Sequence, residues 1–286
     1  MSLISQKPEP AAEGNRVRRS SRVWRGAAIF VLALAVALGS AYFGARVGMD
    51  YKINHLVFEL PVRDSVWAAV KQTLHVQKWY AAGQQDMWVA LAVEPGKRNG
   101  YYVDVGAADG IVHSNTYVFD RMGWKGVCID PFPTNMQVRT CQVFRQPLFS
   151  VSGKKVKFRV AGENGGIEDT MNRYAENTKN APVVEFVTAT LDEILEKAKA
   201  PRHIDYISID VEGAELEALR GFSLNKYDFD ALTVEHNNEW DKREAMRQLL
   251  ESNGYERVRS WVTDDWYVRK PLAARYEFAL QFGFRQ

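Results

Sequence analysis

"YYVDVGAADG", residues 101–110, has the pattern of a buried strand that ends in a glycine-containing turn. Apart from Asp104, its first five residues are apolar or aromatic, as expected inside a sheet, and Gly106 marks the end of the strand. Asp109 lies on the far side of the turn. Turns between a strand and a helix often bind nucleotides, so this stretch predicts a nucleotide-binding fold and raises the question of which nucleotide.

Strand and helix patterns alternate along the chain after this turn. The expected strands are residues 101–105, 126–130, 156–162, 205–210 and 229–237, and the expected helices are residues 114–122, 190–198, 211–222 and 241–252. Two further stretches, residues 255–262 and 265–270, form an expected closing hairpin. This alternation predicts an α/β fold with a mostly parallel sheet that helices cover on both faces.

Carboxylates follow the ends of the predicted strands, at the edge where open α/β sheets bind ligands. They are Asp104, Asp130, Asp210 and Glu235. The turn has neither the G-x-G-x-x-G pattern of dinucleotide sites nor the GK[ST] ending of a P-loop, and its aspartates would repel a phosphate. S-adenosylmethionine, with its sulfonium and ammonium groups, suits an acidic turn by charge complementarity. Asp130 is placed to accept both ribose hydroxyls, whereas the competing interpretation makes these aspartates turn and cap residues.

Composition and charge exclude several classes of protein. The formal net charge of +2 is too small to indicate nucleic acid as the main partner. With 46% apolar residues the chain can bury a substantial core. Cys128 and Cys141 form no CxxC pair and belong to no Cys/His cluster, so we expect two separate buried thiols, without a disulfide framework or structural zinc.

Residues 26–45 form an uncharged apolar run, which as a helix of about 1.5 Å rise per residue would span the hydrocarbon core of a membrane. Arginines are concentrated before it, at positions 16, 18, 19, 22 and 25. This asymmetry predicts a single-pass membrane protein with a cytosolic N-terminus and a translocated C-terminal domain. A cleaved signal peptide is the alternative. Gly44 and Gly48 match the GxxxG spacing of helix dimers, which makes a homodimer through this helix a further hypothesis.

Several blocks of the sequence resemble the FkbM-like methyltransferases. In order they are "GYYVDVGAADG", "SNTYVFDRMGWKGVCIDPFP", "TLDEIL", "DYISIDVEGAELEALRGF", "LTVEHN" and "DDWYV", and they extend over about residues 85–268. The resemblance implies a class I, Rossmann-like methyltransferase fold, with a last strand antiparallel to the rest, that uses S-adenosylmethionine. Family members mostly act on hydroxyls of sugars or secondary metabolites.

The resemblance also implies roles for individual residues. The cofactor-binding residues it indicates are Asp104, Gly106, Asp109, Ser114, Asn115, Asp130 and Asp210. Asp130 matches the ribose-binding acid, where the family often has glutamate. Asp210, Glu212 and Glu215 match the "DVEGAE" block.

Methyl transfer to a hydroxyl requires removal of one proton, which a base or a metal ion must assist. The candidate catalytic residues are Asp210, Glu212, Glu235 and His236, of which Asp210 or His236 would take the proton while Glu212 and Glu235 position the substrate. We expect no metal ion, although Asp210, Glu235 and Asn237 could hold Mg²⁺ through oxygen ligands. For Glu212 and Glu215 the competing role is that of first-turn acids favoured by the helix dipole.

These observations predict five segments: a basic tail at 1–25, a transmembrane helix at 26–45, a juxtamembrane helical segment at 46–95, a methyltransferase domain at 96–270 and an aromatic tail at 271–286. The expected function is that of a membrane-anchored, S-adenosylmethionine-dependent O-methyltransferase acting on a glycan, glycolipid or other metabolite. One alternative is a catalytically silent, methyltransferase-like membrane adaptor or trafficking protein. Another is a nicotinamide-dependent oxidoreductase, which the missing G-x-G-x-x-G disfavours.

Overall fold

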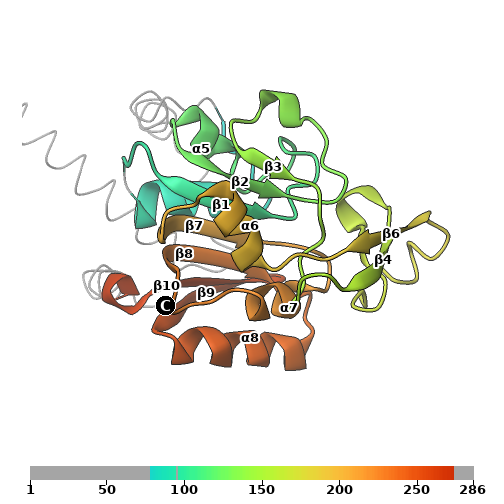
Figure 1. The fold of residues 1–286 in the computed structure, drawn as a ribbon. Helices are drawn as coiled ribbons and strands as arrows, with labels where there is room; N and C mark the ends of the chain where they lie inside the picture. The colour runs from blue at the N-terminus through green and yellow to red at the C-terminus, as the bar shows by residue number, and fades with distance from the viewer. Residues whose placement is uncertain (1–77, 95, 274–286) are drawn as a thin grey trace, which may run out of the picture.

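The computed structural model describes residues 78–94 and 96–273, which form a twisted central sheet with helices on both faces and a small second sheet at one end (Figure 1). Its central strands are β1 (Tyr101–Val105), β2 (Lys125–Ile129), β3 (Gln142–Phe144), β7 (His203–Ile209), β8 (Asp228–Glu235), β9 (Tyr255–Trp261) and β10 (Asp264–Arg269). Their order is β3-β2-β1-β7-β8-β10-β9.

The pairing directions agree with the predicted topology. β1 pairs in parallel with β2 and β7, and β7 pairs in parallel with β8. The last strand, β10, pairs antiparallel with both β8 and β9. The prediction of a mostly parallel, Rossmann-like sheet with an antiparallel last strand is confirmed, and the strand order reverses between β1 and β7, where such sheets bind ligands.

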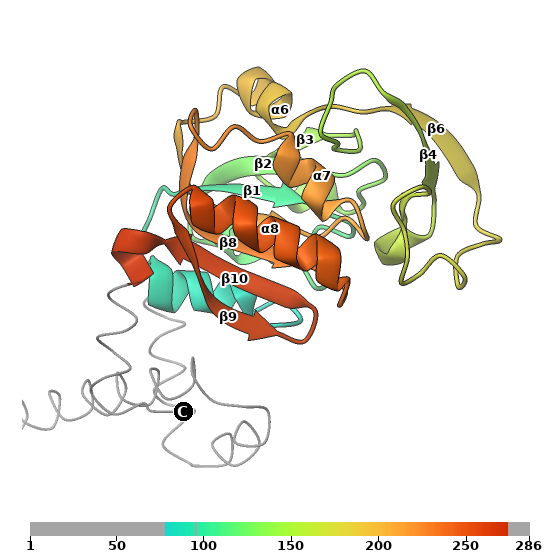
Figure 2. The same cartoon turned by 90° about the horizontal axis from the view of Figure 1, so that it is seen from below.

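Two cores lie on opposite faces of this sheet because side chains alternate along each strand. Val103 and Val105 face a core closed by α6 (Leu191–Ala198), α7 (Glu215–Arg220) and α8 (Trp240–Ser252). Tyr102 faces the other core, which is closed by α5 (Tyr117–Arg121), α4 (Gln85–Trp88) and the π-helical turn η1 (Val89–Val93). Figure 2 shows α7 and α8 on one side of the sheet and the 85–93 segment on the other.

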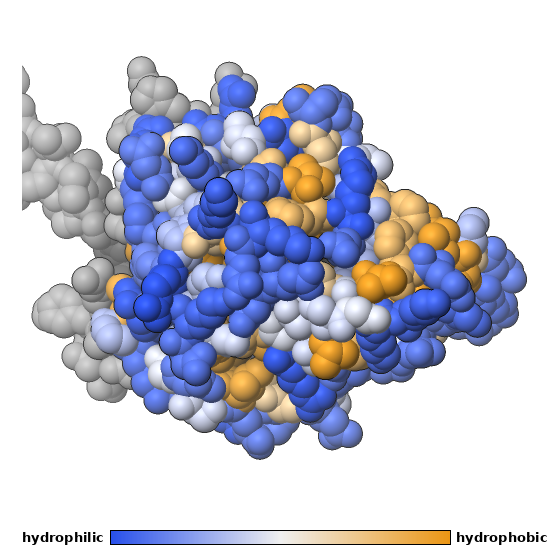
Figure 3. Space-filling model, viewed as in Figure 1, coloured by the Kyte–Doolittle hydropathy of each residue, from blue (hydrophilic) through white to orange (hydrophobic). Residues whose placement is uncertain are grey.

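The second sheet has the order β5-β4-β6 and extends beyond the carboxyl edge of the central strands. Its strands are β4 (Lys155–Arg159), β5 (Gly166–Ile167) and β6 (Val183–Val187), and short 3-10 turns η2 (Met136–Val138) and η3 (Gly162–Asn164) lie in nearby loops. The sequence pattern predicted β4 but not this separate sheet. Val183, Val184 and Val187 are exposed on β6, in the apolar area over β4 and β6 in Figure 3.

The prediction of two separate buried thiols is wrong, because Cys128 and Cys141 form a disulfide with their Cα atoms 5.8 Å apart. The pairing of β2 with β3 sets Cys128 opposite Val143, so the chain returns past β2 close to Cys141. The disulfide closes the loop that follows β2.

Within the described part of the chain, no helix has the length and apolar character needed to cross a membrane. The predicted span at residues 26–45, its preceding basic tail, most of the juxtamembrane helical segment expected at residues 46–95 and most of the aromatic tail lie outside the described residues.

Candidate active site

A cavity of about 600 Å³ opens at the carboxyl edge of the central sheet, between that edge and the second sheet. Eight carboxylic acids line it: Asp104, Asp109, Asp130, Glu163, Asp210, Glu212, Glu235 and Asp264. Among the described residues, no lysine or arginine lines it, and His113 is the one histidine that does. The cavity therefore favours a cationic ligand over a phosphate.

The turn after β1 brings the backbone unusually close to the end of β7. Gly106 has a φ of +91°, and a Cβ added there would lie 1.6 Å from the carbonyl oxygen of Asp210. Gly110 has a φ of +78°, and a Cβ there would lie 2.5 Å from Cε of Met136. Gly106 is therefore needed for the shape of the cavity wall, and Gly110 for the shape of the turn that follows it.

Asp104 lies in the cavity wall, but its charge is directed into the protein. Its carboxylate accepts a 2.5 Å hydrogen bond from Thr116 and lies 3.5 Å from Nη1 of Arg139. The Arg139 side chain is fully buried and also binds Asp120 at 2.6 Å. Asp104 is therefore balanced by Arg139, and it is not the free counter-charge for an ammonium group that we expected.

Asp109 organises the turn itself. One carboxylate oxygen accepts from the backbone N–H groups of Ile111 and Val112, and the other accepts from the side chains of Thr134 and Asn135. These hydrogen bonds hold the pKa of Asp109 below its ordinary value. The turn-residue interpretation thus describes this aspartate well, although it also lines the cavity.

Asp130 follows β2 and faces the cavity beside the same turn. Its two oxygens accept hydrogen bonds from the backbone N–H groups of Phe132 and Ala108, at 2.7 and 3.0 Å. Burial raises its pKa. A carboxylate oxygen can accept more than one hydrogen bond, so Asp130 can still bind ligand hydroxyls.

Ser114 and Asn115 also line the cavity, where the chain leads into α5. The Ser114 hydroxyl accepts from the backbone N–H groups of Thr116 and Tyr117, and Asn115 donates to the Ser208 hydroxyl at 2.9 Å. Both side chains hold the loop beside β1 and β7 in place. Gly165, just before β5 of the second sheet, and Ile167, within β5, also line the cavity.

Asp210 and Glu235, at the ends of the adjacent strands β7 and β8, share a hydrogen bond that requires one of the two carboxyls to carry a proton. Burial, followed by repulsion from Asp210, raises the pKa of Glu235 far above its ordinary value. Burial, followed by repulsion from Asp264, raises the pKa of Asp210 to about 6. Glu235 is therefore the protonated partner at neutral pH, and the pKa of Asp210 lies close to neutral pH.

Glu212 lies beside this pair, and Asn237 connects them. Asn237 donates to Glu235 at 2.5 Å and to Glu212 at 3.3 Å. Burial and repulsion from Asp210 raise the pKa of Glu212 to about 8. Glu212 and Asn237 both have positive φ, at 56° and 48°, an uncommon conformation that often marks functional sites.

Arg173 was missed by the sequence analysis. Its Nη1 donates to the side-chain oxygen of Asn237 at 2.6 Å and lies 3.8 Å from Oε1 of Glu235. Arg173 comes from a polar loop with no recognisable motif, so only the folded chain brings this cation to the edge of the carboxylate group. It lies outside the cavity wall.

His236 does not join the other candidate catalytic residues. It is 3% exposed and is absent from the cavity wall. Its Nδ1 accepts from the backbone N–H of Asn238, and its Nε2 lies 3.8 Å from Asp265. Glu235 and His236 are neighbours in an extended strand end, so their side chains point to opposite sides.

Gln85 and Asp264 also line the cavity and were not predicted as site residues. The Gln85 amide donates to Oδ2 of Asp264 at 2.7 Å, while its own oxygen is buried without a hydrogen-bond partner. These residues are 179 positions apart, so no local sequence pattern connects them. Burial raises the pKa of Asp264 to about 6.

Carboxylate oxygens of Asp210, Glu215 and Glu235 lie within 4.8 Å of one another and could hold a divalent cation. Glu215, however, already accepts hydrogen bonds from the backbone N–H groups of Val211 and Gly213 with one oxygen. It caps the loop before α7, as the first-turn interpretation anticipated.

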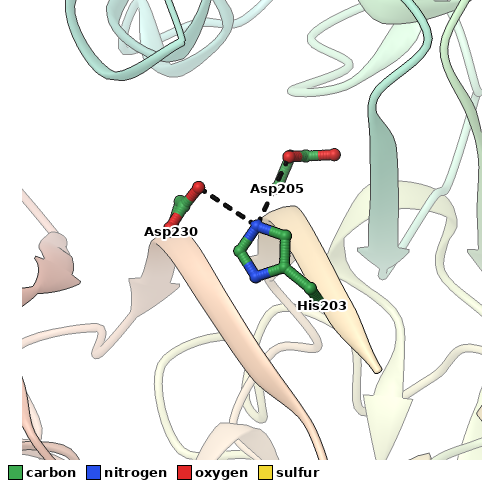
Figure 4. Close-up of side chains that lie close together, drawn as sticks. All are labelled: His203, Asp205 and Asp230. Carbon is green, nitrogen blue, oxygen red and sulfur yellow. Dashed lines mark hydrogen bonds and ion pairs between the residues drawn. The ribbon is translucent and has the colours of Figure 1, made fainter. Parts of the chain in front are cut away.

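A second group of titratable side chains lies at the opposite, amino edge of the sheet (Figure 4). Nε2 of His203 lies 3.2 Å from Asp230 and 3.6 Å from Asp205. Lys97 pairs with Asp205, and Arg269 pairs with Asp230. Because cations already neutralise these acids, the group is an ion-pair network that joins β7 to β8.

Comparisons with known proteins point to one family. The model of the methyltransferase FkbM domain matches residues 104–257. No curated protein matches the chain. A crystal structure described as that of an RNA methyltransferase from Pyrococcus horikoshii is similar over 66% of this chain and 83% of its own, with 11% identity and a TM-score of 0.33.

Proposed function

Because this chain belongs to the methyltransferase FkbM domain family, we propose that it is an S-adenosylmethionine-dependent O-methyltransferase. Its acceptor would be a hydroxyl of a glycan, glycolipid or other metabolite at a membrane. The observation that carries this proposal is the cavity with eight carboxylic acids and, among the described residues, no lysine or arginine in its wall. A sulfonium cofactor is attracted to such a site, whereas a pyrophosphate is repelled.

The residues around the β1 turn fit S-adenosylmethionine. Gly106 lets the turn approach the end of β7 more closely than a Cβ would allow, and Asp130 presents carboxylate oxygens to the cavity for the ribose hydroxyls. Phe132, exposed beside Asp130, offers an apolar ring for the adenine. When bound, the cofactor would supply an electrophilic methyl group.

Asp210 is the residue we assign to take the proton from the acceptor hydroxyl. It lies at the end of β7 beside Gly106, and a pKa of about 6 keeps it largely ionised at neutral pH. Glu235 donates the hydrogen bond that orients Asp210, and Asn237 holds Glu235 in turn. We assign no proton transfer to His236, because its side chain lies outside the cavity wall.

We also propose that the catalytic domain lies across the membrane from the cytosol. The arginines before residues 26–45 support this orientation. The Cys128–Cys141 disulfide supports it independently, because disulfides persist in oxidising compartments. Such a compartment would have to receive the cofactor from the cytosol, where it is made.

Calorimetry of the full-length protein with S-adenosylmethionine and with NAD tests the cofactor. We expect binding of the first alone, and preferential binding of NAD would contradict the proposal. Transfer of a labelled methyl group to a mixed glycan and lipid extract then tests activity. Cofactor binding without transfer to any fraction would favour the catalytically silent adaptor.

Resistance of the C-terminal domain to protease in sealed vesicles of known orientation tests its location. Protection in vesicles whose cytosolic face points outward is the expected result, and digestion in these vesicles would place the domain in the cytosol.

A further inference from the structure

The cavity has two parts, which the order of the strands keeps separate. The β1 turn and Asp130 form one part, beside β1 and β2. Gln85 and Asp264 belong to the other part, beside β10, which is the third strand from β1. With neighbouring strands about 4.8 Å apart, this places the backbone of Asp264 roughly 14 Å across the sheet from β1. The second part is thus the place for the methyl acceptor.

Packing fixes Gln85 beside Asp264. Trp88 lies one turn after Gln85 in α4, and Trp266 lies two residues after Asp264 in β10. The two rings pack at a tilt of 37°, with their centroids 4.8 Å apart. The backbone before α4 is held by Asp86, which accepts from the N–H groups of Tyr80 and Ala81. The pair is therefore part of the rigid wall.

This pair presents one buried hydrogen-bond acceptor, Oε1 of Gln85, that no donor among the described residues satisfies. Gln85 is 5% exposed, and its Oε1 has no hydrogen-bond partner. The Gln85 amide group must face the Asp264 carboxylate, since a carboxylate only accepts, and this leaves Oε1 unpaired. Among the described residues, the hydrogen bond from Gln85 is the one that the Asp264 carboxylate accepts, and no lysine or arginine forms an ion pair with it. A buried acceptor without a donor is costly and indicates a ligand that donates.

We propose that Gln85 and Asp264 bind a protonated amine of the methyl acceptor, so that the acceptor is an amino sugar or another amino alcohol. This inference rests on the proposed function, because it assigns the acceptor of the same reaction. An ammonium group donates three hydrogen bonds, two of which Asp264 and Gln85 can accept. A divalent cation would need about six oxygen ligands, and this pair supplies two.

Matched sugars test the proposal on the full-length protein with S-adenosylhomocysteine bound, so that no turnover occurs. The probes are methyl glucosaminide, methyl glucoside and methyl glucuronide. We expect the glucosaminide to bind at least about tenfold more tightly than the glucoside, as a charge-assisted hydrogen bond provides, and the glucuronide to bind most weakly. Equal binding of the three sugars, or no binding of the glucosaminide, would overturn the proposal.

Asp264→Asn keeps the shape of the side chain and removes its charge. We expect this variant to lose the preference for the amine while its affinity for S-adenosylmethionine stays within about twofold, and Gln85→Leu to weaken the preference in the same direction. Glu196→Gln, at an exposed site on α6, is the matched control and should change neither affinity.

Failure of the acceptor assignment can be distinguished from failure of the proposed function. Absence of S-adenosylmethionine binding by the wild-type protein would contradict the proposed function itself. If Asp264→Asn weakens cofactor binding about tenfold instead, the pair binds the cofactor's own ammonium group, and the acceptor assignment is wrong.

Discussion

The carbonyl oxygen of Asp210 occupies the position next to Gly106 that any side chain would need, 1.6 Å from where a Cβ would lie. The end of β7 and the turn after β1 therefore fix each other. Because Asp210 is also the proposed base, the geometry of the reacting edge depends on a residue without a side chain.

Gly106→Ala should destabilise the protein by at least about 3 kcal/mol, because alanine adds both backbone strain and a clash with a backbone atom. Gly123→Ala is the matched control: Gly123 has a similar φ of +82°, but nothing lies within 4 Å of its Cβ position. The free energy of unfolding of that variant should fall by only about 1–2 kcal/mol. Urea unfolding measures both, and equal losses would mean that the approach to Asp210 is not tight.

The Cys128–Cys141 disulfide closes the loop that carries Asp130 and Arg139. Replacing both cysteines by alanine should lower the free energy of unfolding by about 3 kcal/mol, as expected for a loop of this length. The affinity for S-adenosylmethionine should fall as well, because Asp130 and Arg139, the cation that balances Asp104, lie on the freed loop. Thermal unfolding and calorimetry measure these effects.

Reduction of the wild-type protein with dithiothreitol, verified by the mass of the alkylated thiols, should reproduce the effects of the double variant. Unchanged stability and unchanged cofactor binding after complete reduction would contradict this role of the disulfide.

Much of the fold follows from local patterns, and much of the site does not. Strand periodicity and glycine positions predicted the strands that end at Asp104, Asp130, Asp210 and Glu235, since each signal lies within a few residues. What each carboxylate contacts depends on distant residues. Arg139, which balances the charge of Asp104, comes from a loop with no motif. Charge complementarity therefore assigned Asp104 to a ligand without taking account of this cation of the protein itself.

The other differences between the predicted and the observed site come from the directions of side chains and from long-range contacts. Sequence adjacency of Glu235 and His236 suggested a shared site, yet adjacent residues in extended chain face opposite sides. The partners Gln85 and Asp264 are 179 residues apart, and the disulfide partners are brought together by the pairing of β2 with β3. Long-range contacts of this kind need the folded chain.

Arg139 should be essential for stability because its fully buried side chain binds two acids, Asp104 and Asp120. Arg139→Met leaves both carboxylates buried without a cation, which should cost about 3–5 kcal/mol. Arg139→Met combined with Asp120→Asn should recover part of this loss. Arg121→Met, at an exposed site on α5, is the control and should stay within about 0.5 kcal/mol of wild type in chemical unfolding. An unchanged free energy of unfolding for Arg139→Met alone would contradict this role of Arg139.

Glu235→Gln should make the protein more stable and less active. Burial and neighbouring acids raise the pKa of Glu235, so the folded protein holds a proton there that the unfolded chain releases above its ordinary pKa of about 4.3. Stability from this group is therefore complete at low pH and is lost as pH rises from the unfolded pKa toward the raised folded one. Glutamine keeps the hydrogen bonds to Asp210 and Asn237 without a proton to lose.

We expect the variant to gain several kcal/mol at pH 8 and to unfold like wild type at pH 4. Urea unfolding across this range measures the difference, and a gain that is independent of pH would contradict the raised pKa. The rate of methyl transfer should fall by about tenfold or less, because the amide still orients Asp210 but donates a weaker hydrogen bond than a carboxylic acid does. Glu244→Gln, at an exposed site on α8, serves as the control, since its pKa of about 2 gives the opposite sign of pH dependence.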